Sequence, residues 1–205
     1  VSQDVAVFCQ THVGLDPRKI EVVVNGVEPE RFQRVQPRDL SELGIDAEDL
    51  VIAWIGRLDP QKDPLVAIEA FGRLDASFSD CHLVMAGEGP LQGRIESACA
   101  RTGLVGRVHL LGRVPDVPQL LARSCGMLLT SQWEGMPNVV LEAMAAGRPV
   151  VARLSEGVSD LVEDGVTGWM VADNQVSSLT SAIEQLLSDP GLGSEMGERG
   201  CQKVT

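Results

Sequence analysis

The sequence predicts an α/β fold, a doubly wound parallel sheet in a three-layer α/β/α arrangement. Apolar runs of strand length alternate with segments of helical periodicity along the 205 residues. Most of these runs are continuous in hydrophobicity, which is typical of strands buried on both faces of a parallel sheet. Repeated strand–helix alternation favours helices on both sides of such a sheet.

The expected strands are apolar runs bounded by turns, and they cover 20–24, 51–56, 82–87, 108–112, 126–131, 149–153 and 168–171. Helical periodicity predicts helices at about 63–74, 90–102, 117–123, 137–146, 158–163 and 176–188. Outside this alternation we expect an amphipathic helix within 1–19, a polar connection with a short helix over 28–49, and a last helix over 190–205.

Composition excludes several classes of protein. A net charge of −12 provides no basic face for nucleic acid, and 3% aromatic residues with no Tyr argue against a lectin or a single-strand platform. Five widely spaced cysteines without CxxC predict neither a disulfide scaffold nor a zinc site. No apolar run approaches the ~20 residues of a membrane span. The chain starts at Val1 without Met, so we expect a fragment.

Ligands of open parallel sheets bind outside the carboxyl ends of the strands. Glycine or another small residue recurs at these ends, as in Asn25-Gly26, Gly87-Glu88-Gly89, Gly112-Arg113 and Ser155–Gly157. Each glycine alone is equally well explained by a tight turn. Their recurrence at neighbouring strand ends favours a ligand site along this edge.

The stretch "GRLDPQKD" places Arg57 and Lys62 after a strand and before a helix N-terminus. Two cations beside that dipole end suit a diphosphate. Two surface cations in a loop would have the same spacing, and the spacing alone favours that interpretation. "GEGP" at 87–90 is at most a weak phosphate loop, and the three histidines, His12, His82 and His109, are interpreted as structural or surface residues.

The stretch "EGMPNVVLE" places one carboxylate in a loop and another in a helix. Pro137 suits the first helical position, and Gly147 ends the helix. Glu134 precedes the helix, whereas Glu142 is the only charge in its apolar interior and therefore needs a partner. Ribose hydroxyls would provide one, and so would a backbone amide in a structural role. The unpaired amides of the helix start could hold a phosphate or sugar oxygen.

Taken together, these motifs resemble the C-terminal domain of retaining, GT-B-type glycosyltransferases of the glycosyl transferases group 1 class. The resemblance spans about residues 20–190. It rests on "NGV" with Phe32, "GRLDPQKD", "AGEGP", "V..LGRVPDV", "SQWEGMPNVVLEAMAAGRPVVA" and "DLVEDGVTGWMV". The fold it implies is one Rossmann-like half of a GT-B enzyme.

The resemblance also implies a role for each matching residue. Arg57 and Lys62 would bind the donor diphosphate, Glu134 hydroxyls of the transferred sugar, and Glu142 the ribose. The loop 112–117 would pack on the nucleobase. Arg57, Lys62 and Glu134 would be the catalytic residues, and no metal is expected. The implied donor site comprises Gly56, Arg57, Lys62, Gly87, Gly112, Arg113, Val114, Val117, Glu134, Gly135, Met136, Pro137, Asn138, Val139 and Glu142.

The resemblance further implies a missing N-terminal acceptor domain. We expect residues 1–19 to be the end of that domain, with Val1-Ser2 finishing its last strand, followed by a linker helix. Residues 20–190 would form the nucleotide-sugar domain and 191–205 a truncated C-terminal helix. One departure from the family pattern is Glu156-Gly157, an extra carboxylate near the phosphate position that could alter sugar choice or face solvent.

The leading hypothesis is the donor-binding domain of a retaining hexosyltransferase that uses a UDP- or GDP-sugar, with a glycan or lipid acceptor bound by the absent domain. This chain alone would bind donor without transferring it. A cytoplasmic location is expected, with peripheral association at the inner membrane face through the missing domain as an option. A GT-B-fold nucleotide-sugar epimerase and a non-catalytic nucleotide-sugar-binding module are the alternatives.

Overall fold

The computed structural model describes residues 3–205, with side chains from Val5 onwards. In this part of the chain six parallel strands form one sheet in the order β3-β2-β1-β4-β5-β6. The strands are β1 (Leu50–Ile55), β2 (Cys81–Ala86), β3 (Val108–Leu110), β4 (Gly126–Leu129), β5 (Val150–Arg153) and β6 (Gly168–Val171). The predicted doubly wound parallel sheet is confirmed.

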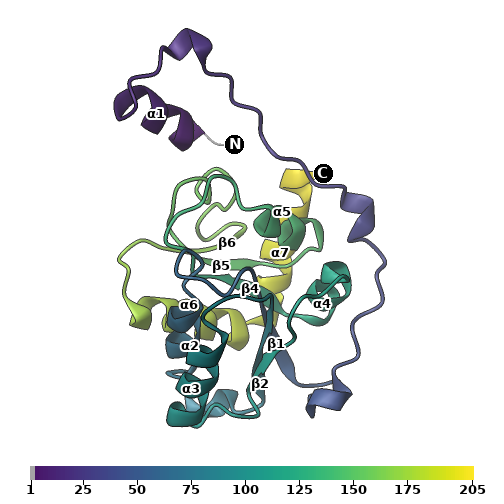
Figure 1. Cartoon of the computed structure of the whole chain (residues 1–205). Helices are drawn as coiled ribbons and strands as arrows, with labels where there is room; N and C mark the ends of the chain where they lie inside the picture. Colours follow the sequence, from purple (N-terminus) through teal and green to yellow (C-terminus); the bar gives the residue numbers. More distant parts are fainter. Residues whose placement is uncertain (1–2) are drawn as a thin grey trace.

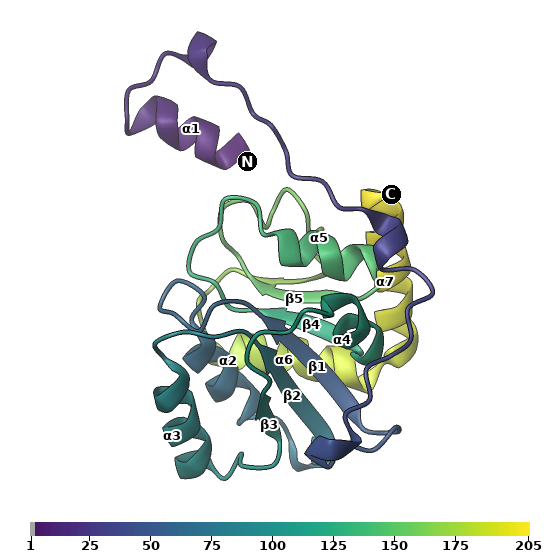
Figure 2. The same cartoon turned by 45° about the vertical axis from the view of Figure 1, so that its right-hand side comes forward.

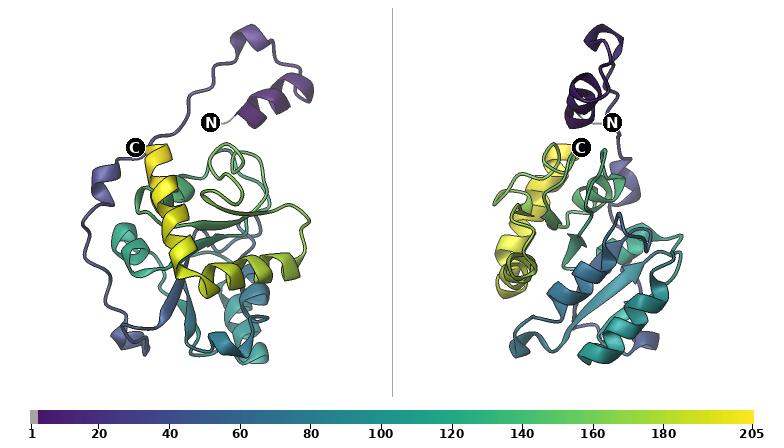
Figure 3. Two further views of the ribbon diagram at one scale, coloured as in Figure 1. Left: turned by 180° about the vertical axis from the view of Figure 1, so that it is seen from behind. Right: turned by 60° about the vertical axis from the view of Figure 1, so that its left-hand side comes forward.

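Helices cover both faces of the sheet. One face carries α2 (Pro64–Phe71), α3 (Gln92–Thr102) and α6 (Val176–Ser188), and the other carries α4 (Val117–Arg123) and α5 (Asn138–Ala145). The last helix, α7 (Pro190–Val204), packs beside α5 and α6. Seen from behind, α6 and α7 run across the strands (Figure 3). Short 3-10 turns occupy Pro17–Lys19, Pro29–Arg31, Ser41–Leu43 and Ala76–Phe78.

The strands bury both of their faces, as their continuous hydrophobicity predicts. Within β1, Ile52 and Trp54 join the core beneath α2, α3 and α6, whereas Val51 and Ala53 join the core beneath α4 and α5. All four side chains are 2% exposed or less. The alternation follows from the two-residue period of a strand, and it gives the domain one core on each side of the sheet.

The N-terminal segment stands apart from this body. Helix α1 (Gln3–Thr11) and the turn at Pro17–Lys19 lie away from the sheet and are joined to it by extended chain (Figures 1 and 2). The helix predicted within 1–19 is present and ends at Thr11, and the connection 28–49 contains 3-10 turns rather than an α-helix. The predicted strand end at Val1-Ser2 lies outside the described residues. The predicted domain boundaries stay predictions.

Two predicted elements are wrong. Residues 20–24 are extended but not part of the sheet, and Val23 and Val24 are exposed. An apolar run becomes a strand only where a neighbouring strand edge accepts its backbone hydrogen bonds, and this run lies outside the sheet. Residues 158–163 form turns instead of a helix, because Val162 N–H bonds back to Val158 but the next amides bond elsewhere.

The strand order reverses between β1 and β4, and this reversal creates a crevice at their carboxyl ends. The chain leaves β1 towards α2, which packs on one face, and leaves β4 towards α5, which packs on the other. The two loops that diverge here are 56–63 and 130–137. Both contain residues that the sequence singled out.

Glycines let the loops of this edge approach one another closely. Gly87 has φ of 146°, donates its N–H to the Gly112 carbonyl at 2.8 Å, and would bring a Cβ to 1.8 Å from the Gly56 carbonyl oxygen. Gly157 has φ of 77°, and a Cβ there would lie 1.9 Å from the Gly135 oxygen. At these two positions a side chain would push neighbouring loops apart.

At the opposite edge, Asp49, His82 and His109 form a polar chain. His82 Nε2 lies 3.4 Å from Asp49 Oδ2, and His82 Nδ1 lies 3.1 Å from His109 Nε2. Burial lowers the pKa of His109, and the neighbouring His82 lowers it further, against a hydrogen bond with the Gly106 backbone that raises it. Both histidines therefore have structural surroundings, as their position in the sequence suggested.

We predict that His109 makes the domain less stable at acidic pH. A histidine whose pKa is lower in the folded state binds fewer protons there than in the unfolded chain. Stability should therefore decrease as the pH falls through the unfolded value of about 6.5. Urea unfolding between pH 7.5 and 5 should show a smaller loss for His109→Gln than for wild type. His12→Gln, at an exposed site, should lose as much as wild type. Equal losses in all three proteins would contradict the assignment.

We predict that Gly87→Ala destabilises the domain by about 3 kcal/mol, because it adds backbone strain to a backbone clash. For a chain of this size the melting temperature should fall by roughly 10 °C. Gly93→Ala is the matched control, since a Cβ at this α3 position meets no atom within 4 Å. It should leave stability unchanged or raise it by up to about 1 kcal/mol. Thermal denaturation of both variants tests this prediction. An unchanged melting temperature for Gly87→Ala would refute the close packing of Gly87 against Gly56.

Candidate functional site

A cavity of about 520 Å³ opens at the carboxyl ends of β1, β2 and β3. Its walls are mainly backbone and aliphatic side chains, contributed by Ile55, Gly56, Arg57, Ala86, Gly87, Glu88, Arg113, Val114 and Val117. Six of the sequence-predicted donor residues are among them, and Gly112 bonds to Gly87 directly behind the wall. A flat apolar group with few polar contacts would fit such a surface.

In the loop after β1, one carboxylate contacts the Arg57 guanidinium and the Lys62 backbone. Asp59 Oδ2 pairs with Arg57 Nη1 at 3.0 Å, and Asp59 Oδ1 accepts the backbone N–H of Lys62 at 3.0 Å. Arg57 also donates to Gln61 at 2.9 Å, yet its side chain remains 69% exposed. Asp59 was not among the predicted site residues, although an acid between two cations was a readable signal in "GRLDPQKD".

Lys62 and Glu134 meet across the crevice between β1 and β4. Lys62 Nζ lies 2.5 Å from Glu134 Oε1, with the two side chains 16% and 6% exposed. The same oxygen accepts a hydrogen bond from Ser131 Oγ at 2.6 Å. Two residues 72 positions apart in the sequence therefore form one largely desolvated pair, which the sequence placed at the same edge but did not join.

The start of α5 is fixed by Asn25. Its Nδ2 donates to Asn138 Oδ1 at 2.7 Å and to the Met136 carbonyl at 3.3 Å. Met136 also lines a separate cavity of about 470 Å³ with residues 24–27, so its side chain belongs to the packing of α5. Pro137 is the N-cap rather than the first helical residue, because its ψ of 108° is extended. This correction is within the usual uncertainty of helix ends.

The first turn of α5 faces the edge with unpaired backbone groups. No hydrogen bond is described within residues 3–205 for the amides of Gly135, Met136 and Asn138. Val139 in the same turn is half-buried. Free amides at a helix start carry a partial positive charge and suit an anionic oxygen.

Glu142 is half-buried within α5 and has no side-chain hydrogen bond in the described part of the chain. Burial raises the pKa of its carboxyl group, and the positive charge of Arg31 opposes part of that rise. The described chain shows no backbone amide bonded to the Glu142 carboxylate, and its role stays a prediction.

The predicted residues are spread along the edge rather than gathered in one cavity. The walls of the 520 Å³ cavity include Arg57 but not Lys62, Glu134 or Glu142. Ser155, after β5, was in a stretch noted in the sequence but not predicted as a site residue, and its hydroxyl is buried without a partner in the described chain. Glu156, the extra carboxylate, is exposed.

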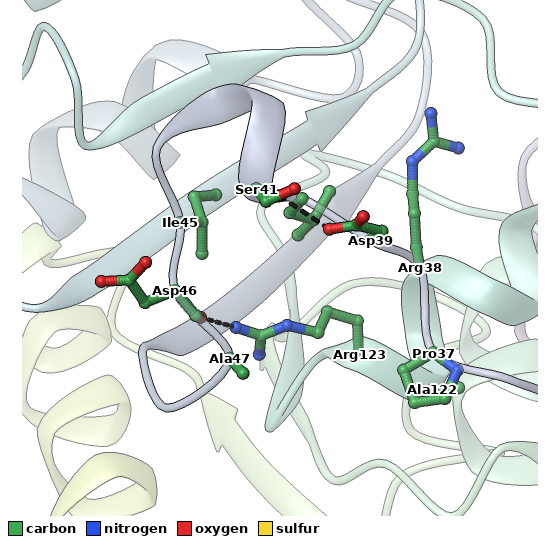
Figure 4. A pocket seen from close by; sticks show the side chains of 10 residues that line it. Pro37, Arg38, Asp39, Ser41, Ile45, Asp46, Ala47, Ala122 and Arg123 are labelled. Atoms are coloured by element: carbon green, nitrogen blue, oxygen red, sulfur yellow. Dashed lines mark hydrogen bonds between the residues drawn. The ribbon is translucent and has the colours of Figure 1, made fainter.

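A second cavity, of about 510 Å³, lies at the amino-terminal edge of the sheet, beside the end of α4 (Figure 4). Arg123 donates to the Asp46 carbonyl at 2.6 Å, and Asp39 accepts the Ser41 N–H at 2.9 Å. Figure 4 shows the Arg38 side chain extending away from Arg123. The polar groups here bond to the protein's own backbone and do not converge on the hollow, so this cavity makes a poorer ligand site.

Residues 3–205 contain no cluster of three or more His, Cys, Asp or Glu side chains arranged as metal ligands. All five cysteines are free thiols in this part of the chain. The described helices include none with the length and apolarity that a bilayer crossing requires. The prediction that no metal takes part stays a prediction.

Comparison with known proteins gives a consistent family. Residues 35–203 match the family described as Glycosyl transferases group 1. The UDP-Gal:alpha-D-GlcNAc-diphosphoundecaprenol alpha-1,3-galactosyltransferase of Escherichia coli is 33% identical over 188 residues, covering 89% of this chain and 49% of that protein. The alpha-D-kanosaminyltransferase of Streptomyces kanamyceticus is 34% identical, covering 76% of this chain and 40% of that protein.

Solved structures agree with the fold. Anabaena Alr3699/HepE in complex with UDP superposes with a TM-score of 0.86 at 25% identity, covering 99% of this chain and 57% of that one. The glycosyltransferase WaaG has a TM-score of 0.88 at 21% identity, covering 100% and 57%. The chain thus spans about half the length of the relatives it matches. It belongs to the glycosyl transferases group 1 family and has the fold of one half of a GT-B glycosyltransferase, consistent with the C-terminal domain.

Proposed function

We propose that this domain binds the nucleoside-diphosphate sugar that serves as donor for a retaining hexosyltransferase. The observation that carries the proposal is the Lys62–Glu134 pair at the crevice between β1 and β4, with Arg57 beside it and the 520 Å³ cavity adjoining. A cation for phosphate and a carboxylate for hydroxyls then lie together. The 25% identical Anabaena protein was solved in complex with UDP, which supports a nucleotide as the ligand.

The phosphates would lie over Arg57, Lys62 and the start of α5. Arg57 is mostly exposed and its guanidinium has donors beyond those given to Asp59 and Gln61. Lys62 donates one of its three N–H groups to Glu134, which leaves two for a ligand. Together with the free amides of α5, these donors would offset the charge that develops on the departing diphosphate.

The nucleoside and the sugar would lie on either side of the phosphates. The base would contact the aliphatic wall formed by Val114 and Val117, where backbone groups provide the polar contacts. Glu142 would accept the ribose hydroxyls, and Glu134 a hydroxyl of the transferred sugar. These roles position the substrate rather than transfer protons. No metal ion takes part in this scheme.

The acceptor, a glycan or lipid, would bind to the part of the enzyme that this chain does not include. The relatives are about twice as long as this chain, so we expect donor binding without transfer from the chain alone. Membership of a glycosyltransferase family favours transfer over epimerisation. Product analysis of the longer protein with donor alone distinguishes them, because an epimerase would return an epimerised donor.

We predict that the domain binds UDP or GDP. Arg57→Ala and Lys62→Ala should each lower the affinity for the tighter-binding of the two by about 10- to 100-fold. Each loses a charge-assisted hydrogen bond to phosphate, worth about 1.5–3 kcal/mol. Titration calorimetry measures the affinities. Arg73→Ala is the charge-matched control, because Arg73 follows α2 away from this edge and pairs with Glu69. Affinities equal to wild type for both site variants would refute the phosphate assignment.

We predict opposite effects of Glu142→Gln on stability and on binding. The folded-state pKa of Glu142 is raised, so its ionised form opposes folding as the pH rises above the unfolded value of about 4.3. Glu142→Gln should therefore stabilise the ligand-free domain at pH 7 but not at pH 4. It should lower the binding affinity for UDP or GDP by about tenfold, because a charged acceptor for the ribose hydroxyls is lost. Unchanged affinity would leave Glu142 without a role in the site.

A further inference from the structure

Two adjacent hydroxyl residues at the end of β4 hold the two partners of the Lys62–Glu134 pair. Thr130 is fully buried, and its Oγ1 lies 2.9 Å from the Lys62 carbonyl and 3.0 Å from the Asp63 carbonyl. The same oxygen accepts the indole N–H of Trp54 at 3.0 Å. Thr130 thereby fixes the backbone that carries Lys62.

Ser131 fixes the other partner through its side chain. It is 1% exposed, and its Oγ donates to Glu134 Oε1 at 2.6 Å. Lys62 binds the same oxygen at 2.5 Å. Both bonds therefore fall on Oε1, and no hydrogen bond within residues 3–205 reaches Oε2.

This asymmetry divides the carboxylate into an anchored oxygen and a free one. With Oε1 held from two directions the side chain has a single orientation, and Oε2 keeps its full capacity to accept. A bound diphosphate would attract Lys62 and weaken its bond to Glu134. The Ser131 hydroxyl is neutral, so a bound diphosphate would not draw it away from Glu134. It would therefore keep Glu134 in place when the donor binds.

We propose that Ser131 is a positioning residue, which holds Glu134 so that Oε2 accepts a hydroxyl of the donor sugar. The inference rests on the proposed donor-binding function. It goes further in assigning sugar recognition to one oxygen and its orientation to a residue that touches no substrate. Its consequence is selective: Ser131 should matter for a nucleotide sugar and not for the nucleoside diphosphate alone.

The test compares each variant with two ligands by titration calorimetry. The sugar ligand is whichever of UDP-glucose, UDP-galactose, UDP-N-acetylglucosamine and GDP-mannose the wild type binds most tightly, and its partner is the matching UDP or GDP. Ser131→Ala should lower the affinity for the nucleotide sugar by about tenfold. It should lower the affinity for the nucleoside diphosphate by less than about twofold. Ser131→Cys, which retains a weaker donor, should fall between Ser131→Ala and wild type.

Ser124→Ala is the matched control. Ser124 is also 1% exposed, donates its hydroxyl to the Leu120 carbonyl at 2.8 Å, and precedes β4 at the opposite edge. Its removal should leave the ratio of the two affinities unchanged. Thermal melts of all variants show whether each is folded. If Ser131→Ala does not fold, Ser131→Cys takes its place in the comparison of the two ligands.

A double-mutant cycle shows whether Ser131 acts through Glu134. In a Glu134→Ala background, Ser131→Ala should change nucleotide-sugar affinity by less than about twofold, because the group it orients is gone. A persistent tenfold effect in that background would overturn the inference. So would equal weakening of both ligands by Ser131→Ala, while the proposed function would stand. Failure of the wild type to bind UDP, GDP and all four sugars would overturn both.

Discussion

The ion pair between Lys62 and Glu134 is the interaction on which the carboxyl edge of this domain depends. Neither charge is well solvated, and a charge removed from water is stable only when an opposite charge and hydrogen bonds replace the water. The pair also bridges the loops after β1 and β4, which the strand order sends to opposite faces of the sheet. It therefore joins the two halves of the crevice where ligands of doubly wound sheets bind.

The two glutamates of "EGMPNVVLE" differ because their surroundings differ. Glu134 receives a lysine and a serine on one oxygen, so its charge is balanced before any ligand arrives. Glu142 has no such bond in the described chain and lies partly buried in α5. A group kept in an unfavourable environment is the usual sign of a function that outweighs its cost in stability. Glu134 is held by two hydrogen bonds, whereas Glu142 is half-buried without one in the described chain.

Several parts of the structure were predictable from local patterns. The strands at β1, β2 and β4 are continuous apolar runs followed by glycine or polar residues, and such runs are buried wherever a parallel sheet forms. Helix α5 was readable from Pro137 and Gly147 to within one residue. The run at 20–24 looked like a strand for the same reason that β1 did, yet it lies outside the sheet. Composition does not say whether a neighbouring edge is free to pair.

The candidate site likewise has features that the local sequence predicts and features that depend on the tertiary structure. The sequence by itself determined which chemical groups stand at the strand ends: Arg57, Lys62, Glu134 and the unpaired amides of a helix start. These follow from residue type and from the order of strands and helices along the chain. Only the tertiary structure decided that Lys62 meets Glu134, that Ser131 and Lys62 share one of its oxygens, and that Asn25 clamps α5. Contacts between loops that are far apart in sequence depend on strand order and on how closely backbones approach, and a one-dimensional pattern does not contain that information.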